Sequence, residues 1–386
     1  MFRPATVREP NVHRYMPVLD GVRGVAVLLV VLHHIYLRAP ISHPVDRVFA
    51  WLGHASWTGV DLFFVLSGFL ITGILLDARD SPTYFRAFYW RRLVRIFPLY
   101  YAFLAVVFIA VPLILGQPAF GVPAADQWWF WLYLSNFYMT DAWVAPGLDH
   151  LWTLAIEEQF YMVWPAVVYA LGRDRLRTLC LVLLPSVFVL RVVLSLTGTG
   201  GQEIYVSTWT RFDTLAAGAL LACLARDGGL LRLRPVAWMG VAVSTAAILW
   251  WGGTFEAFGV PFQPPALVGG LYTPIYALFA GLLVLILTQE GGWTDVFRGR
   301  VLPTFGKYSY AVYVLHFPVD TGLRALGLHP SSWYAPEQLQ LFGFGLYFVL
   351  VSGLSLVAAM LSWHLLEKHF LKLKGRVPYV KAGAAQ

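Results

Sequence analysis

The chain has 386 residues, of which 58% are hydrophobic and only 13% are charged, and its formal net charge at pH 7 is +7. Soluble globular chains carry roughly 25% charged residues, so this composition excludes a water-covered globule and predicts an integral membrane protein. The two cysteines, Cys180 and Cys223, both lie inside apolar runs, which excludes a disulfide framework and a cysteine-rich metal site.

Apolar stretches of about 20 residues, the length that crosses a bilayer core as a helix, recur along the whole chain. They predict an all-α, polytopic integral membrane protein with about ten transmembrane helices. The expected spans are 18–38, 57–77, 95–116, 150–172, 178–197, 208–226, 235–252, 268–288, 305–327 and 342–366. We expect them to form a single membrane domain over residues 1–386, with no soluble domain appended to it.

Basic residues are concentrated in alternate connections between the expected spans. The segments on one side hold most of the 28 Lys and Arg residues, whereas the segments on the other side hold Arg47 and, at a helix edge, Arg38. Under the positive-inside rule, this asymmetry predicts a multi-pass protein of the inner (plasma) membrane with both termini in the cytoplasm. Membrane topology also explains the net positive charge of the chain. We therefore expect membrane lipid as a partner and no nucleic acid.

Ionisable residues inside the expected spans are candidates for function, because an Arg or Asp at the bilayer centre costs at least roughly 2.5–3.5 kcal/mol. Arg23 and His34 are eleven residues apart, close to three helical turns, so both lie on one face of the first span at different depths. Asp61 is about one turn into the second span, and Glu157 and Glu158 are about two turns into the fourth. His34 and these carboxylates are therefore expected at a similar depth in the outer half of the membrane.

A histidine beside a carboxylate, away from bulk water, can act as a general base, because the carboxylate orients the imidazole and stabilises its protonated form. We therefore predict His34 as the base, oriented by one of these three carboxylates, with His33 as the alternative imidazole. The competing interpretation is a structural cluster that joins the first, second and fourth spans by hydrogen bonds. A metal site is not favoured, because adjacent histidines on a helix point about 100° apart.

Arginines gather on one helix face at the inner end of the third span. Arg92 and Arg95 are three residues apart, and Arg91 and Arg95 are four residues apart, so each pair shares a face of a helix. Guanidinium groups arranged in this way suit a phosphorylated ligand at the cytoplasmic surface of the membrane. The alternative is topological, since inner loops of membrane proteins are generally rich in basic residues.

Ser67 and Gly68 are adjacent within the second expected span. Ser67 is a nucleophile by residue type, but a Ser-Gly pair in a span is typical of close packing between helices. We therefore predict that this pair joins two helices and takes no part in a reaction.

Several sequence blocks occur in the order found in a known family. The first runs from Leu19 to Leu28 and is followed by His34, eleven residues after Arg23. The other strong blocks are Gly59–Ile71, Arg91–Tyr101 and His150–Tyr161, and the weaker ones are Arg211–Asp213, Gly306–Tyr310, His316–Pro318 and Glu367. With these blocks the chain resembles the membrane-bound acyltransferase-3 family of bacterial O-acyltransferases, which act on glycans and envelope components.

The resemblance implies an acyl-CoA donor, usually acetyl-CoA, as a co-substrate, with no tightly bound cofactor and no metal. It implies a hydroxyl acceptor on a glycan, a lipid-linked sugar or a glycosylated small molecule. The implied CoA-binding residues are Arg23, Arg91, Arg92 and Arg95, and the candidate substrate-binding residues are His33, Asp213 and His316. For Asp213 and His316, pairing with other spans is the alternative. His34 then deprotonates the acceptor hydroxyl or carries the acyl group itself as an acyl-histidine.

A transporter or flippase of an envelope glycolipid precursor is the main competing function, with the histidine and carboxylates as a proton relay. The sequence shows no inverted repeat and no matching pair of interrupted helices in its two halves, which transporters of this kind often have. The inner arginines also favour a phosphorylated donor. The acyltransferase is therefore the preferred interpretation.

Overall fold

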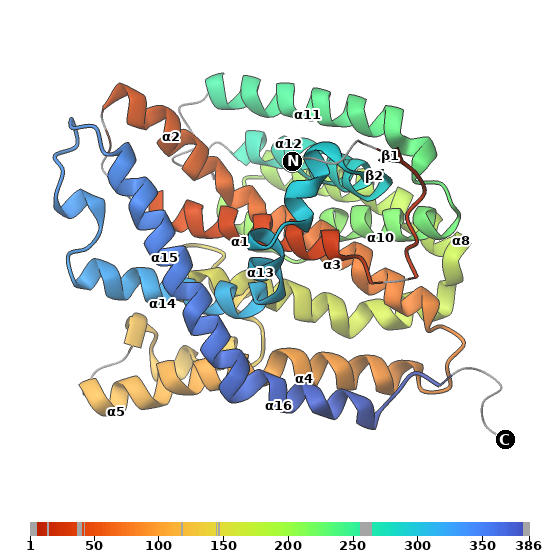
Figure 1. Ribbon diagram of the computed structural model, residues 1–386, viewed down its shortest axis with the longest axis horizontal. Helices are drawn as coiled ribbons and strands as arrows, with labels where there is room; N and C mark the ends of the chain where they lie inside the picture. The colour runs from red at the N-terminus through yellow and green to blue at the C-terminus, as the bar shows by residue number, and fades with distance from the viewer. Residues whose placement is uncertain are drawn as a thin grey trace.

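The computed structural model describes residues 6–13, 15–36, 41, 43–116, 119–143, 145, 147–254 and 265–380. Its long elements are helices, most of which lie side by side in a bundle (Figure 1). The helices are α1 (Pro17–Tyr36), α2 (Pro44–Ala55), α3 (Gly59–Asp77), α4 (Tyr84–Ala105), α5 (Val111–Leu115), α6 (Trp128–Trp131), α7 (Ser135–Tyr138), α8 (Trp152–Leu196), α9 (Gly201–Val206), α10 (Phe212–Arg226), α11 (Arg234–Thr254), α12 (Pro265–Thr288), α13 (Val301–Lys307), α14 (Ser309–Ala325), α15 (Leu341–Ser362) and α16 (Lys368–Leu371). In the described ranges the only strands are β1 (Thr6–Val7) and β2 (Gln289–Glu290), which pair antiparallel. The predicted helical class is confirmed.

Helix occupies each of the ten expected spans, but seven helical segments are long and apolar enough to cross a membrane. These segments are Pro17–Tyr36, Pro44–Asp77, Tyr84–Ile114, Asp149–Leu196, Leu231–Trp250, Gly270–Thr288 and Leu341–Arg376. α10 and α14 are shorter, with 15 and 17 residues, and a break at Tyr308 separates α14 from α13 within one expected span. The count of seven applies to the described residues, and the count of about ten crossings stays a prediction.

α8 is 45 residues long and contains two of the expected spans. Gly172 interrupts it with φ 67° and ψ −179°, a conformation that is open to glycine because it has no Cβ. Beside this break, Arg79 donates from Nε and Nη2 to the carbonyl oxygen of Tyr169, at 3.2 and 3.1 Å. The break divides α8 into halves of about 20 residues, each long enough to cross a bilayer once.

α1 lies inside the bundle and contacts α2, α3, α13, α14 and α15. Its residues Val27, Val31 and Ile35 are fully buried, as expected of a helix covered by others on most of its faces. α4 runs along the edge of the bundle, beside α16 (Figure 1). This arrangement leaves space between α1 and α4 for the cavity described below.

α3 and α10 cross in close contact at Gly68 and Gly218. A Cβ added at Gly218 would lie 2.0 Å from the carbonyl oxygen of Val65, so even alanine is too large for this crossing. We expect Gly218→Ala to destabilise the protein by about 1–3 kcal/mol, the usual cost of overpacking. Thermal unfolding in detergent measures this, with Gly353→Ala as the control, because a Cβ at Gly353 meets no atom within 4 Å. Equal midpoints for the two variants would contradict the prediction.

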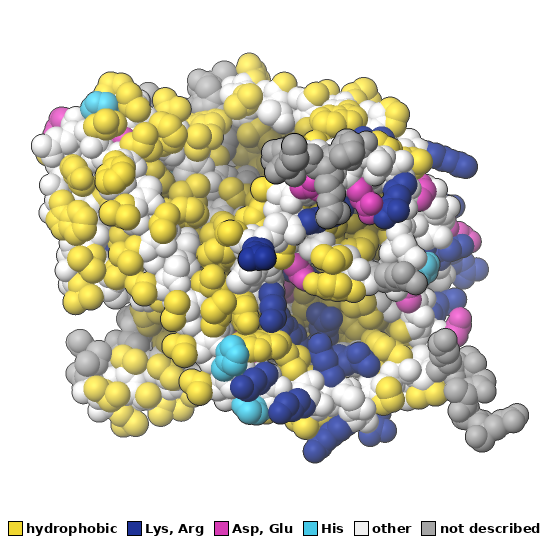
Figure 2. Space-filling view, viewed as in Figure 1, with side chains coloured by type: hydrophobic (Ala, Val, Ile, Leu, Met, Phe, Trp, Pro, Cys, Tyr) yellow, Lys and Arg dark blue, Asp and Glu magenta, His cyan; other side chains and the backbone are white. Residues whose placement is uncertain are grey.

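Basic side chains are unevenly distributed over the surface. Figure 2 shows Lys and Arg gathered on the right-hand and lower parts of this face, whereas the left-hand part, around α2 and the start of α15, shows almost none. The uneven distribution agrees with the asymmetry seen in the sequence. The assignment of the basic side to the cytoplasm stays a prediction.

Candidate functional site

A cavity of about 560 Å³ lies between α1, α3, α4, α8, α13 and α14. Figure 2 shows a hollow in the basic part of the surface, with Lys and Arg side chains around it. The cationic residues that line the cavity are Arg23, Arg91, Arg92, Arg95, Lys307 and Lys374, and the carboxylates are Asp20 and Glu157. Its volume falls within the range of small-molecule and cofactor sites, roughly 300–1,000 Å³.

The cations of the cavity outnumber the carboxylates that could neutralise them. Arg23 donates from Nη1 to Asp20 Oδ1 at 2.8 Å, and Arg95 Nη1 lies 3.8 Å from Glu367 Oε2. Four further cations form no ion pair with a carboxylate in the part of the chain that the structure describes: Arg91, Arg92, Lys307 and Lys374. Cations left unpaired in one cavity favour a ligand that carries several negative charges.

Aromatic rings hold two of these arginines in place. The guanidinium carbon of Arg91 lies 4.9 Å from the ring centroid of Tyr379, and that of Arg92 lies 5.7 Å from the ring centroid of Tyr161. Both distances are within the range of cation–π contacts. The sequence predicted that Arg95 shares a helix face with Arg92 and with Arg91. In the structure all three line the same cavity, together with Arg23.

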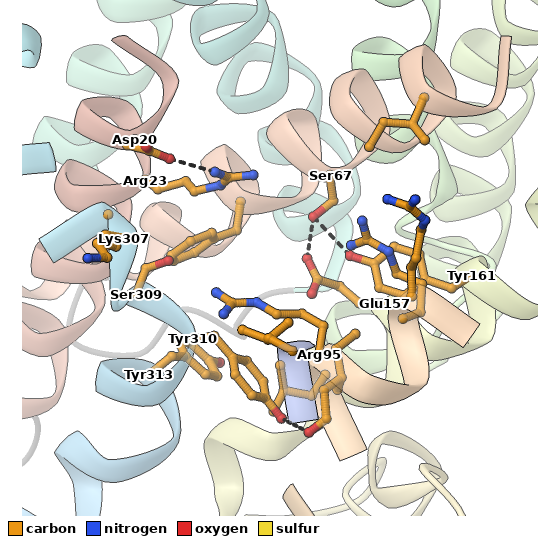
Figure 3. Close-up of a pocket in the computed structure, with 18 of the residues that line it drawn as sticks. Asp20, Arg23, Ser67, Arg95, Glu157, Tyr161, Lys307, Ser309, Tyr310 and Tyr313 are labelled. Atoms are coloured by element: carbon orange, nitrogen blue, oxygen red, sulfur yellow. Dashed lines mark hydrogen bonds and ion pairs between the residues drawn. The ribbon is translucent and has the colours of Figure 1, made fainter. Parts of the chain in front are cut away.

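Glu157 and Ser67 form a hydrogen-bonded pair on the cavity wall. Ser67 Oγ donates to Glu157 Oε1 at 2.6 Å, and the Tyr161 hydroxyl donates to Ser67 Oγ at 3.4 Å (Figure 3). Gly68 packs closely against α10, and Ser67 joins α3 to α8 through its hydrogen bond to Glu157. That Ser67 takes no part in a reaction stays a prediction. Glu158 is buried and does not line the cavity, as its position next to Glu157 predicts.

Three histidines from three different segments of the chain meet inside the bundle. The ring centroid of His34 lies 4.9 Å from that of His316 and 6.4 Å from that of His150, and the latter two rings are 5.2 Å apart. His150 and His316 are buried, at 2% and 0% exposure. The sequence identified His34 and His316 as candidates but gave no role to His150, which lies in the short turn directly before α8.

Backbone carbonyls determine which nitrogen of His34 is free. His34 Nδ1 is 2.9 Å from the Val30 carbonyl oxygen, and because a carbonyl can only accept, Nδ1 carries the proton. By the same argument His316 Nδ1, 2.7 Å from the Tyr313 carbonyl oxygen, is protonated, so its Nε2 accepts from His34 Nδ1 at 3.2 Å. His34 Nε2 is left as the unprotonated nitrogen, which is the form that a general base requires.

Tyr313 connects the cavity to the histidines. Its side chain lines the cavity, and its hydroxyl lies 2.6 Å from Thr153 Oγ1 and 2.8 Å from the His150 carbonyl oxygen. Its own carbonyl oxygen accepts from His316. The wall formed by Tyr313 and Thr153 therefore separates the cavity from the histidine cluster by a single layer of side chains.

Asp61 does not contact His34, although its predicted role was to orient that imidazole. It pairs with Arg211, and both side chains are fully buried. The bonds that orient His34 come from Val30 and His316, and no carboxylate among the described residues hydrogen-bonds to it. The physical reason is that the buried Arg211 cation needs a counter-ion. A role for Asp61 in the reaction stays a prediction, without the contact to His34 on which it was based.

The remaining two predicted site residues also bond to other parts of the bundle. Asp213 Oδ2 is 2.7 Å from Arg191 Nη1, and this pair joins α10 to α8 inside the protein. His33 Nδ1 is 3.1 Å from the His54 carbonyl oxygen, so the ring faces α2. His34 is therefore the member of the adjacent pair that joins the histidine cluster.

Comparison with known proteins gives a consistent result. A family model described as an acyltransferase domain matches residues 16–364. The peptidoglycan O-acetyltransferase OatA of Listeria monocytogenes is 30% identical over 334 residues, covering 80% of this chain and 50% of the relative. A Bacillus subtilis protein named "Putative peptidoglycan O-acetyltransferase YrhL" is 29% identical over 386 residues, covering 92% of this chain and 55% of the relative. The chain thus spans about half the length of these relatives, and no solved structure matches it.

Proposed function

The chain belongs to the acyltransferase-3 family, and on that premise we propose that it transfers an acetyl group from acetyl-CoA to a hydroxyl of a cell-envelope glycan. The main support is a cavity with unpaired cations that extends to a wall directly beside a histidine cluster. The relatives that carry the name peptidoglycan O-acetyltransferase support an O-linked acetyl group and a peptidoglycan-type acceptor.

The basic part and the apolar part of the cavity lining both support acetyl-CoA as the donor. The phosphates of CoA suit the unpaired arginines and lysines, because charge-assisted hydrogen bonds to phosphate are the strong ones. The other part of the lining is apolar and includes Val60, Phe63 and Phe64. It suits the acyl-pantetheine arm, which would reach toward Tyr313 and Thr153 while the nucleotide stays at the basic side.

The proposed reaction uses His34 Nε2 as the base. It removes the proton of the acceptor hydroxyl while that oxygen attacks the thioester carbonyl carbon. The carbon–sulfur bond then breaks, the CoA thiolate leaves, and the proton passes from His34 to the thiolate sulfur. In the alternative, Nε2 itself attacks the thioester carbon, the carbon–sulfur bond breaks, and the CoA thiolate leaves. The acceptor hydroxyl then attacks the acyl-histidine, the acyl–nitrogen bond breaks, and the hydroxyl proton neutralises the thiolate. Both routes require an unprotonated Nε2.

The proposed orientation places the reaction across the inner membrane. Arg23 and His34 lie in opposite halves of α1, with the arginine in the basic cavity. With the basic side and both termini in the cytoplasm, acetyl-CoA enters from the cytoplasm and the glycan hydroxyl approaches His34 from outside. The acetyl group is thus the part of the donor that crosses the membrane.

Arg92→Leu is expected to lower kcat/KM for acetyl-CoA by about ten- to a hundredfold, because it removes a charge-assisted contact worth about 1.5–3 kcal/mol. The assay follows label from acetyl-CoA into glycan, together with the release of free CoA thiol, in membranes that contain the protein. Arg86→Leu is the matched control, since Arg86 is exposed on the same helix and does not line the cavity.

Two outcomes of this assay count against the proposal. Equal kcat/KM values for the Arg92→Leu and Arg86→Leu proteins would show that the cavity does not bind the donor. Movement of an envelope glycolipid across the membrane, without consumption of acetyl-CoA, would favour the transporter function instead.

A further inference from the structure

The chain after α16 returns beside the first turns of α4 (Figure 1). Two of its residues line the cavity. We name residues 372–380 the C-terminal strap. Trp90 Nε1 donates to the Leu373 carbonyl oxygen at 2.8 Å near its start, and Thr83 Oγ1 donates to the Pro378 carbonyl oxygen at 2.7 Å near its end. The Val380 amide donates to Ser81 Oγ at 3.1 Å. The strap is thus held at both ends, and it lies beyond residue 364, where the family match ends.

The strap contributes two polar side chains to the cavity. Lys374 and Tyr379 both line it. Lys374 pairs with no carboxylate in the described residues and lies close enough to Arg91, Arg92 and Arg95 for their charges to act on it. The hydroxyl oxygen of Tyr379 is buried and has no hydrogen-bond partner among the described residues.

A purely structural strap does not account for these two side chains. A lysine held beside three arginines is repelled by them, and a buried hydroxyl without a partner has lost its hydrogen bonds to water. Burial also raises the pKa of Tyr379, so the hydroxyl keeps its proton at neutral pH and stays a donor. An anionic group placed between the strap and α4 would offset the repulsion and accept the hydrogen bond.

We propose that the C-terminal strap is part of the donor site, where the Lys374 ammonium and the Tyr379 hydroxyl bind a phosphate at the nucleotide end of acyl-CoA. The ring of Tyr379, which lies against the Arg91 guanidinium, keeps that arginine directed at the same phosphate. This inference rests on the proposed donor and extends it to a segment outside the family match.

Titration of the full-length protein in detergent with CoA, followed by calorimetry, tests the strap. Lys374→Ala and Tyr379→Phe are each expected to weaken CoA binding, the first by about tenfold or more because it removes a charge-assisted contact. Lys372→Ala is the matched control, because it removes the same charge from the same strap at an exposed position that does not line the cavity. It is expected to bind CoA within about twofold of wild type.

Dephospho-CoA, which lacks the 3′-phosphate, identifies the phosphate involved. If Lys374→Ala weakens binding of CoA but not of dephospho-CoA, the strap binds the 3′-phosphate. If both ligands are weakened equally, it binds the diphosphate. Either result supports the strap as part of the donor site.

The failures of the two proposals are distinguishable. If wild-type protein binds CoA but Lys374→Ala and Tyr379→Phe both behave like Lys372→Ala, the strap proposal is overturned and the donor proposal stands. If wild-type protein does not bind CoA, both are overturned. Limited trypsin cleavage after Lys372 and Arg376 gives a second readout: CoA is expected to slow it, and an unchanged rate with CoA bound would count against the strap.

Discussion

Replacing His34 by glutamine is expected to lower the rate of acyl transfer by about 10²- to 10⁴-fold, the usual contribution of a positioned general base. Its Nε2 is the unprotonated nitrogen and makes no hydrogen bond with the described residues, so it is free to take the acceptor proton. CoA binding is expected to stay within about twofold, because His34 does not line the basic cavity. Single-turnover transfer of label from acetyl-CoA to glycan measures the first effect, and calorimetry measures the second.

His33→Gln is the matched control for this experiment. The residue is adjacent in sequence and its ring lies 5.3 Å from that of His34, but its Nδ1 bonds to the His54 carbonyl oxygen. We expect a loss below about tenfold, because no proton transfer depends on it. Loss of transfer in His33→Gln with full activity in His34→Gln would assign the reaction to the other imidazole. Full activity in both variants, with unchanged thermal unfolding, would exclude a histidine base from this pair.

The sequence predicts the position of a residue along a helix better than it predicts the direction of its side chain around that helix. The positions of Arg91, Arg92 and Arg95 were predictable, because all three lie on one helix and their spacing determines the shared face. His34 was also predictable as a candidate, because it is an ionisable residue inside an expected span. The partner of Asp61 was not, because Arg211 is 150 residues away and similar depth leaves the rotation of each helix undetermined.

Other members of the site had weaker signals in the sequence. His150 lies at the start of a span, where a polar residue is expected near the membrane surface, so nothing set it apart from an interface residue. Lys374 resembles the other basic residues of an inner segment and shows its role only through the return of the chain along α4. Tyr313 is apolar enough to be taken for core, and its connection to His150 and Thr153 exists only in three dimensions.

Replacing Asp61 by asparagine is expected to destabilise the protein by about 3–5 kcal/mol, the usual cost of removing one partner of a buried ion pair. The Arg211 cation would then be buried without a counter-ion, although the Tyr272 ring, 4.4 Å from its guanidinium carbon, would offset part of the cost. Arg211→Met is expected to destabilise the protein by a similar amount, because it leaves the buried Asp61 carboxylate without a counter-ion. Thermal unfolding in detergent, with the yield of folded protein in membranes, measures both.

The double variant Asp61→Asn with Arg211→Met separates a structural role of this pair from a catalytic one. With both charges removed, the desolvation cost disappears, so most of the stability lost in each single variant is expected to return. If Asp61 only holds α3 against the start of α10, acyl transfer returns with stability. If Asp61 takes part in the reaction, as its depth in the membrane suggested, the double variant folds but stays inactive. A stable and fully active Asp61→Asn single variant would contradict both roles, since the buried Arg211 would then tolerate the loss of its partner without cost.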